Sequence, residues 1–213
     1  LGAWCAVDNY PDSILDIGAG TGVLSLMLAQ RSDAMTIDAV ELDENAYEQT
    51  VENFESSDWG DRLYCYNASF QEFADEILAE EETYDLIVSN PPFYTDTFKT
   101  SDESRNKARF TSSLSFQELL LGVSKILSDA GRFSVILPFK EKEIFLSIAK
   151  ENKLFLNRFC SVQGNESSAI KRILLEFSFH VSEIIETHLV IETGRHQYTE
   201  AYKNLTQAFY LKM

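Results

Sequence analysis

Four consecutive residues, Asn90-Pro91-Pro92-Phe93, combine hydrogen-bond acceptors, a rigid backbone and an aromatic ring. Two consecutive prolines fix the backbone and have no N–H group, so the side-chain oxygen of Asn90 and the carbonyl oxygen of Pro91 can face the same way. Two such acceptors could hold both hydrogens of an exocyclic amino group and turn its lone pair towards an electrophile. The motif therefore predicts a reaction on a conjugated NH2 group without a strong general base.

The ring of Phe93 adds a flat apolar surface to this motif. A base flipped out of a nucleic acid could stack on it, a contact worth roughly 1–3 kcal/mol per base. The alternative is that the ring packs beneath the following loop. Its position directly after Asn-Pro-Pro favours stacking, so we expect all four residues of the motif to be catalytic.

A second group of residues, Asp16-Ile17-Gly18-Ala19-Gly20-Thr21-Gly22, has three glycines at alternate positions. Glycine lets the chain turn sharply and lets a ligand approach where a side chain would collide. Glu41 follows 19 residues after Gly22, at the end of the next predicted strand, where a carboxylate can accept hydrogen bonds from both hydroxyls of a ribose. The combination predicts a nucleoside pocket, and the alternative is that the glycines serve only a turn.

The spacing of the glycines bears on the kind of ligand. In the GxGxxG pattern of dinucleotide-binding proteins the third glycine comes one residue later than it does here, and in this chain Asp16 precedes the first glycine. That carboxylate would repel a pyrophosphate and attract a cation. We therefore expect a cationic nucleoside ligand rather than a dinucleotide.

Strands and helices alternate along the chain that must position these groups. Apolar runs predict strands over residues 13–17, 36–40, 62–66, 84–89, 131–137, 154–162 and 170–180. Helical spacing of apolar residues predicts helices over residues 23–31, 44–55, 71–78, 116–127, 141–152 and 200–210. Residues 184–192 alternate like a hairpin partner of the strand before them.

This alternation predicts a doubly wound α/β fold with a ligand site at the carboxyl ends of its strands. We expect a Rossmann-like sheet of seven strands, mostly parallel, with an antiparallel edge where the last two strands are joined without a helix. The length of 213 residues favours one domain over residues 1–213. Because the chain begins at Leu1, we expect a preceding N-terminal segment to be missing.

The composition limits the class of partner. With 34 acidic and 18 basic residues, the net charge of −16 opposes non-specific binding to nucleic acid. Three distant cysteines, without a CxxC pair, and three widely spaced histidines predict a reducing compartment and no metal. No leader and no apolar stretch long enough for a membrane helix is visible, so we expect a cytoplasmic protein, with a monomer favoured.

The glycine motif and the carboxylate after it resemble motif I of the class I methyltransferases. The resemblance implies S-adenosyl-L-methionine as cofactor, with its ribose on Glu41. It also places cofactor-binding residues at Asp16, Gly18, Ala19, Gly20, Gly22, Asn67 and Ala68. The last two follow the third strand, where the family often has an acidic or polar residue against the adenine, and an aspartate is absent here.

The Asn-Pro-Pro-Phe motif is similar to the signature of methyltransferases that act on adenine N6, cytosine N4, guanine N2 or a glutamine amide. It indicates the acceptor atom and not the substrate. Four cations in the loop that follows could contact a substrate RNA, or could belong to a solvated loop: Lys99, Arg105, Lys107 and Arg109. Lys171 and Arg172 could extend that surface or simply solubilise a strand.

Further segments resemble the bacterial tRNA (adenine-N6)-methyltransferases that act beside the anticodon of valine tRNA. They are the opening Leu-Gly-Ala-Trp, a Leu-Ser-Phe-Gln-Glu-Leu-Leu helix and the ending Phe-Tyr-Leu-Lys-Met. The chain departs from that family at Phe110, where a histidine is usual, and at Ile170, where a proline is usual. The resemblance implies tRNA as partner, and the alternatives are a guanine-N2 methyltransferase of ribosomal RNA, a glutamine N5-methyltransferase of a protein, or a cofactor-binding partner without chemistry.

Overall fold

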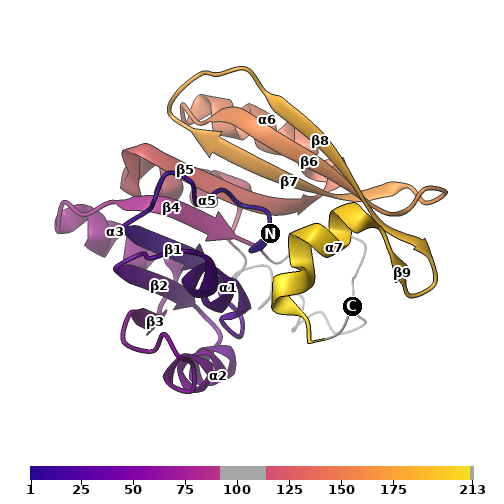
Figure 1. Cartoon of the computed structure of the whole chain (residues 1–213). Helices are drawn as coiled ribbons and strands as arrows, with labels where there is room; N and C mark the ends of the chain where they lie inside the picture. Colours follow the sequence, from indigo (N-terminus) through magenta and orange to yellow (C-terminus); the bar gives the residue numbers. More distant parts are fainter. Residues whose placement is uncertain (92–113, 212–213) are drawn as a thin grey trace, which may run out of the picture.

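The computed structural model describes residues 1–91 and 114–211. Its strands form a single sheet that runs across the molecule from β3 to β9 (Figure 1). Six residues that the sequence predicts to belong to the site lie outside the described residues: Pro92, Phe93, Lys99, Arg105, Lys107 and Arg109.

Within the described residues the sheet has nine strands in the order β3-β2-β1-β4-β5-β7-β6-β8-β9. Four of them, β3, β2, β1 and β4, are parallel to one another and to β5, whereas β7 is antiparallel to both β5 and β6. The strands are β1 Ser13–Ile17, β2 Thr36–Glu41, β3 Leu63–Asn67, β4 Tyr84–Ser89, β5 Leu127–Pro138, β6 Phe155–Asn165, β7 Ile170–Ser178, β8 Ile185–Gly194 and β9 Gln197–Tyr198. The doubly wound fold with an antiparallel pairing is confirmed, with two strands more than expected.

Helices connect the parallel strands and begin at residues suited to cap them. Ser69 and Ser115 each start a helix with a reciprocal capping box, whose partners are Glu72 and Glu118. Asp43 caps the earlier helix Glu44–Glu55 by accepting from the backbone N–H of Ala46 at 3.0 Å. The helices are α1 Val23–Arg31, α2 Glu44–Glu55, α3 Phe70–Ala79, α5 Phe116–Ile126, α6 Lys142–Glu151 and α7 Glu200–Thr206, with short 3-10 turns at Phe139–Glu141 and Gln207–Phe209.

Two apolar clusters hold the helices to the sheet. Leu15, Ile87 and Phe133 point to the cluster formed with α3, α5 and α6, whereas Ile14 and Leu86, their neighbours along the strands, point to the cluster formed with α1 and α2. Successive residues of a strand face opposite sides, so strands covered on both faces must be apolar throughout. This explains the nearly continuous apolar runs at the centre of the sheet.

The expected hairpin between β7 and the segment after it is wrong. Instead, β8 pairs in parallel with β6, because β7 already lies between β5 and β6 and has no free side. The connection crosses the start of β6, where the amide of Asn157 donates to the carbonyl of His180 at 2.9 Å and to the hydroxyl of Ser182 at 2.8 Å. The helix α7 then packs against β8 (Figure 1).

Candidate active site

The turn between β1 and α1 is built on glycines in the left-handed region. Gly18 has φ +70° and Gly20 has φ +60°, a conformation that other residues adopt only with strain. The N–H of Gly18 donates to the carbonyl of Val40 at 2.9 Å, which ties the turn to β2. A Cβ built on either glycine would meet no described atom within 4 Å, so both glycines face open space.

Glu41, at the carboxyl end of β2, connects the turn to the start of α2. One oxygen accepts from the N–H of Gly20 at 2.8 Å, and the other accepts from the N–H of Asp43 at 2.9 Å. A carboxylate has about four acceptor positions, so each oxygen can accept a further hydrogen bond. The side chain is thus fixed in place while it retains the capacity to bind two hydroxyl groups.

Asp16 is completely buried beneath the same turn. One of its oxygens, Oδ2, accepts from the hydroxyl of Ser25 at 2.8 Å and from the backbone N–H of Ser25 at 3.2 Å. The other oxygen, Oδ1, has no hydrogen-bond partner among the described residues. Burial raises the pKa of Asp16 to about 7, the two bonds from Ser25 oppose that rise, and the nearby Glu41 adds to it.

The end of β4 lies beside β1 and carries the acceptor motif into the same region. Ser89 is buried and donates to the carbonyl of Ile17 at 2.9 Å, which fixes the strand end from which Asn90 and Pro91 continue. Both residues line a cavity of about 680 Å³ together with the glycine turn and the end of β2. Its lining residues are Ile17, Gly18, Gly20, Val40, Glu41, Leu42, Asp43, Ala46, Ala68, Ser69, Phe70, Gln71, Ser89, Asn90, Pro91 and Leu114.

Six residues chosen from the sequence therefore line one cavity: Gly18, Gly20, Glu41, Ala68, Asn90 and Pro91. Four others do not line it: Asp16, which is buried beneath the turn, and Ala19, Gly22 and Asn67. The amide of Asn67 donates to the carbonyls of Glu41 and Leu42 at 3.0 and 3.3 Å, so this side chain holds the end of β2. Ala19 packs against the apolar cluster on the α1 side.

Gly22 faces α2. A Cβ there would lie 2.6 Å from a ring carbon of Phe54 and 2.9 Å from the methyl carbon of Thr50, so this glycine is required for packing. The hydroxyl of Thr50 also donates to the carbonyl of Gly20 at 2.7 Å. The third glycine of the motif thus lets α2 approach the turn.

Three apolar residues of the cavity lining were not expected from the sequence: Leu42, Phe70 and Leu114. Leu42 is 51% exposed although it is a large aliphatic residue, and a flat ligand at the cavity would cover it. Its position directly after Glu41, at the carboxyl end of a strand, was a usable signal. Phe70 and Leu114 had none, because each also packs in or against the core.

A larger cavity of about 1000 Å³ lies beside the N-terminal segment and the start of β6. Four of its charged groups form two ion pairs: Arg158 with Glu176 at 3.0 Å, and Arg132 with Asp8 at 2.6 Å. The guanidinium of Arg158 also lies over the ring of Trp4, 4.6 Å from its centre. Because these groups satisfy each other, the smaller cavity with the open glycines is the better candidate for chemistry.

Residues 1–91 and 114–211 are the part of the chain that the structure describes. Among them, no group of three or more His, Cys, Asp or Glu side chains could hold a metal ion. No helix in the same residues is long and apolar enough to cross a membrane.

The sheet order and the placement of this cavity at the strands' carboxyl ends define an α/β methyltransferase of class I. Residues 6–110 match the family model of the methyltransferase small domain. The crystal structure of a predicted O-methyltransferase from Agrobacterium tumefaciens aligns with a TM-score of 0.74 and 16% identity, covering 97% of this chain and 93% of that one. A ribosomal protein L11 methylase from Lactobacillus delbrueckii subsp. bulgaricus aligns with a TM-score of 0.57 and 14% identity, covering 83% of this chain and 74% of that one.

Proteins with similar sequences identify the family within this class of methyltransferases. A tRNA1(Val) (adenine(37)-N6)-methyltransferase from Christiangramia forsetii is 54% identical over all of this chain and 88% of the relative. An enzyme of the same name from Flavobacterium johnsoniae is 53% identical over all of this chain and 90% of the relative. The chain belongs to the family of tRNA1(Val) (adenine(37)-N6)-methyltransferases.

Proposed function

We propose that this protein transfers the methyl group of S-adenosyl-L-methionine to N6 of adenine 37 in tRNA1(Val). The observation that carries the proposal is the meeting of Asn90 and Pro91 with Gly18, Gly20 and Glu41 around one cavity. The identity of 53–54% with enzymes of that name, over the whole chain, supports the choice of substrate.

The residues around the cavity fit this cofactor. The unpartnered oxygen of Asp16 and the nearby Glu41 make the pocket acidic, which suits a ligand that carries a sulfonium and an ammonium group. The open space above Gly18 and Gly20 accommodates a ligand in contact with the backbone. The free acceptor positions of Glu41 suit two ribose hydroxyls, and exposed Leu42 suits the face of an adenine ring.

When bound, S-adenosyl-L-methionine supplies an electrophilic methyl group. The residues of the chain align the acceptor. In the proposal, the side-chain oxygen of Asn90 and the carbonyl of Pro91 accept from the two hydrogens of adenine N6, so that the nitrogen lone pair points along the line of transfer. Phe93, which lies outside the described residues, stays the sequence-based candidate for stacking the flipped base.

A methylation assay tests the proposal directly. The protein is incubated with unmodified tRNA1(Val) transcript and S-adenosyl-L-methionine carrying a labelled methyl group, and the RNA is then digested to nucleosides. We expect the label in N6-methyladenosine, and its loss when adenine 37 is replaced by guanine in the transcript. Label in N2-methylguanosine, in ribosomal RNA alone or in protein alone would overturn the proposed substrate.

A further inference from the structure

The charges of this protein are strongly segregated along the chain. Residues 1–91 contain 20 carboxylates and two arginines, a net charge of −18, whereas residues 131–211 contain nine carboxylates and ten lysines or arginines, a net charge of +1. Nearly all of the total charge of −16 therefore belongs to the part of the fold built on β1 to β4. The part built on β5 to β9 is close to neutral.

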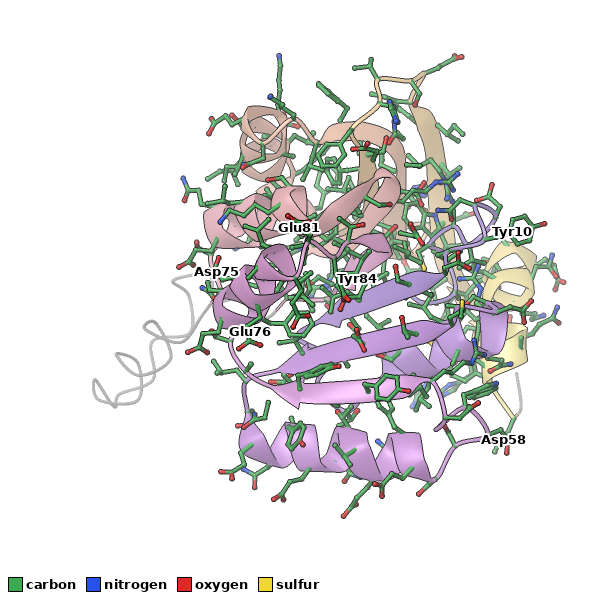
Figure 2. All side chains as sticks on the ribbon, turned by 90° about the vertical axis from the view of Figure 1, so that its left-hand side faces the viewer. Tyr10, Asp58, Asp75, Glu76, Glu81 and Tyr84 are labelled. Carbon is green, nitrogen blue, oxygen red and sulfur yellow. The ribbon has the colours of Figure 1, made fainter. Side chains whose placement is uncertain are left out.

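The acidic part presents its carboxylates outward. Figure 2 shows Asp58 after α2, and Asp75, Glu76 and Glu81 on and after α3, along the outside of this part of the fold. The phosphates of a nucleic acid would be repelled by such a surface, because like charges within about a Debye length of 10 Å act on each other through water. A nucleic acid must therefore approach the cavity from another side.

On the side of β4 away from β1, the next strand of the sheet is β5. Ser89 is level with Val135, so Asn90 and Pro91 lie beside the carboxyl end of β5. The chain there continues into Phe139, an aromatic residue 40% exposed, and Lys140, whose side chain is 59% exposed. Exposed aromatic rings next to cations are typical of surfaces that bind nucleic acids.

The next strands add cations to the same edge. Arg172 is level with Pro138 of β5 on one side and with Val162 of β6 on the other, and Lys171 precedes it; both are exposed. Arg195 follows the end of β8, which runs parallel to β6 and ends at the same edge. We call four residues of this edge the basic edge: Lys140, Lys171, Arg172 and Arg195.

The carboxylate of Glu141 does not cancel the charge of Lys140. Glu141 lies 3.7 Å from the ammonium group of Lys140, a long contact at an exposed lysine, and such pairs contribute little in water. A phosphate that approaches Lys140 can replace this contact at small cost. The carboxylate of Glu141 is itself only 22% exposed, which limits its reach towards a ligand.

We infer that the tRNA docks along the basic edge, with Lys140, Lys171, Arg172 and Arg195 on its phosphates, while the acidic part of the fold repels it and sets its orientation. This inference rests on the proposed function, because it assigns the surface that delivers a base to Asn90. It explains how a chain of net charge −16 binds an RNA.

The test compares two double variants with the same change in charge. K140A/K171A removes two lysines from the basic edge, and the control K125A/K150A removes two lysines from the C-terminal turns of α5 and α6, which lead into β5 and β6 at the opposite edge. Binding of the full protein to a tRNA1(Val) transcript is measured over a range of salt concentrations. Cofactor affinity is measured in parallel to verify that both variants fold.

We expect K140A/K171A to weaken tRNA binding about 5- to 20-fold at 0.1 M salt and to reduce the slope of log affinity against log salt by about 2, with K125A/K150A close to wild type. Equal affinities and slopes for both variants would overturn the inference. So would a loss confined to variants of Lys99, Arg105, Lys107 and Arg109. Both results leave the proposed function intact, since that fails only if the wild-type protein does not produce N6-methyladenosine.

Discussion

The carboxylate of Glu41 accepts a hydrogen bond from the backbone N–H of Gly20 at 2.8 Å, and this bond joins the end of β2 to the turn after β1. The two residues lie 21 positions apart in the chain and come together because β1 and β2 are parallel neighbours. The same side chain that shapes the turn is the one proposed to hold the ribose. Its substitution therefore tests both functions.

Glu41→Gln should weaken the binding of S-adenosyl-L-methionine about tenfold. The amide oxygen of glutamine can still accept from Gly20, but an NH2 group replaces the second oxygen, and this group donates and cannot accept from Asp43 or from a hydroxyl group. Isothermal titration calorimetry measures the affinity. Glu44→Gln, at the exposed start of α2, is the control for the change in charge, and an equal loss in that variant would refute the assignment.

Replacing two glycines of the same motif by alanine should affect two different properties, the stability of the fold and the affinity for the cofactor. Gly22→Ala should lower the melting temperature by several degrees and the free energy of unfolding by more than about 1 kcal/mol, because its Cβ collides with Phe54 in addition to the unfavourable φ. Gly18→Ala has only the unfavourable φ to overcome in the free protein, and its Cβ enters the open space above the turn. It should chiefly reduce cofactor affinity.

Thermal unfolding and cofactor titration on both glycine variants distinguish these outcomes. If Gly18→Ala bound the cofactor normally, the space above the turn would not be the ligand site. A Gly22→Ala protein as stable as the wild type would show that α2 can move away from the turn without cost.

The pH dependence of the free energy of unfolding should reveal the ionisation of buried Asp16. Its pKa is about 7 in the folded protein and 3.8 in the unfolded chain, so its contribution to stability is fully present below about pH 4 and is lost as the pH rises through 7. The loss is on the order of 4 kcal/mol, the free-energy equivalent of that difference in pKa. Asp16→Asn cannot ionise and should remove this decline.

Urea unfolding of the ligand-free protein at pH 5 and pH 8 measures the effect. From pH 5 to pH 8 the free energy of unfolding should fall in the wild type by more than it does in Asp16→Asn. If the two proteins differed in free energy of unfolding by the same amount at both pH values, the pKa of Asp16 could not be near 7. A cationic ligand lowers the pKa of Asp16, so cofactor affinity of the wild type should also increase as the pH rises through 7.

Asn90→Ala should reduce kcat about 100- to 1000-fold with little change in cofactor affinity. The proposed role of the side chain is to align the acceptor amine, and misalignment of a reacting group affects the transition state more than the binding of a separate ligand. Single-turnover methylation of the tRNA1(Val) transcript gives the rate. Asn53→Ala, at the exposed amide that donates to Thr21 at 2.9 Å, is the matched control outside the cavity lining. An equal loss of cofactor binding in Asn90→Ala would reassign the residue to the cofactor.

The sequence predicted the helix and strand boundaries around the site well, because capping residues and glycines mark them locally. Asp43 and Ser69 begin their helices by accepting backbone N–H groups within the next three residues, which is visible in the sequence itself. The strand 84–89 and the helix 44–55 were predicted with their observed bounds. Six cavity residues followed from these positions.

The features that the sequence did not predict depend on which strands and helices become neighbours in the fold. The alternating pattern of 184–192 suits an edge strand of either direction, so it could not indicate that β6 rather than β7 is the partner of β8. Similarly, the sequence shows Asn67 as a polar residue after a strand, but not that its amide faces two carbonyls of the neighbouring β2. The sequence also could not show that Phe54 approaches the third glycine, because that approach is a tertiary contact.

The two-residue strand β9 closes one end of the sheet. The much longer β8 beside it pairs with β6 on one side, whereas on its other side β9 pairs only with Glu192 and Gly194, and α7 packs against it. A long free border would act as a template on which another chain could add its own strand. Because β9 covers only the last residues of β8, this border, together with the opposite one formed by β3, is where strand addition between molecules would begin.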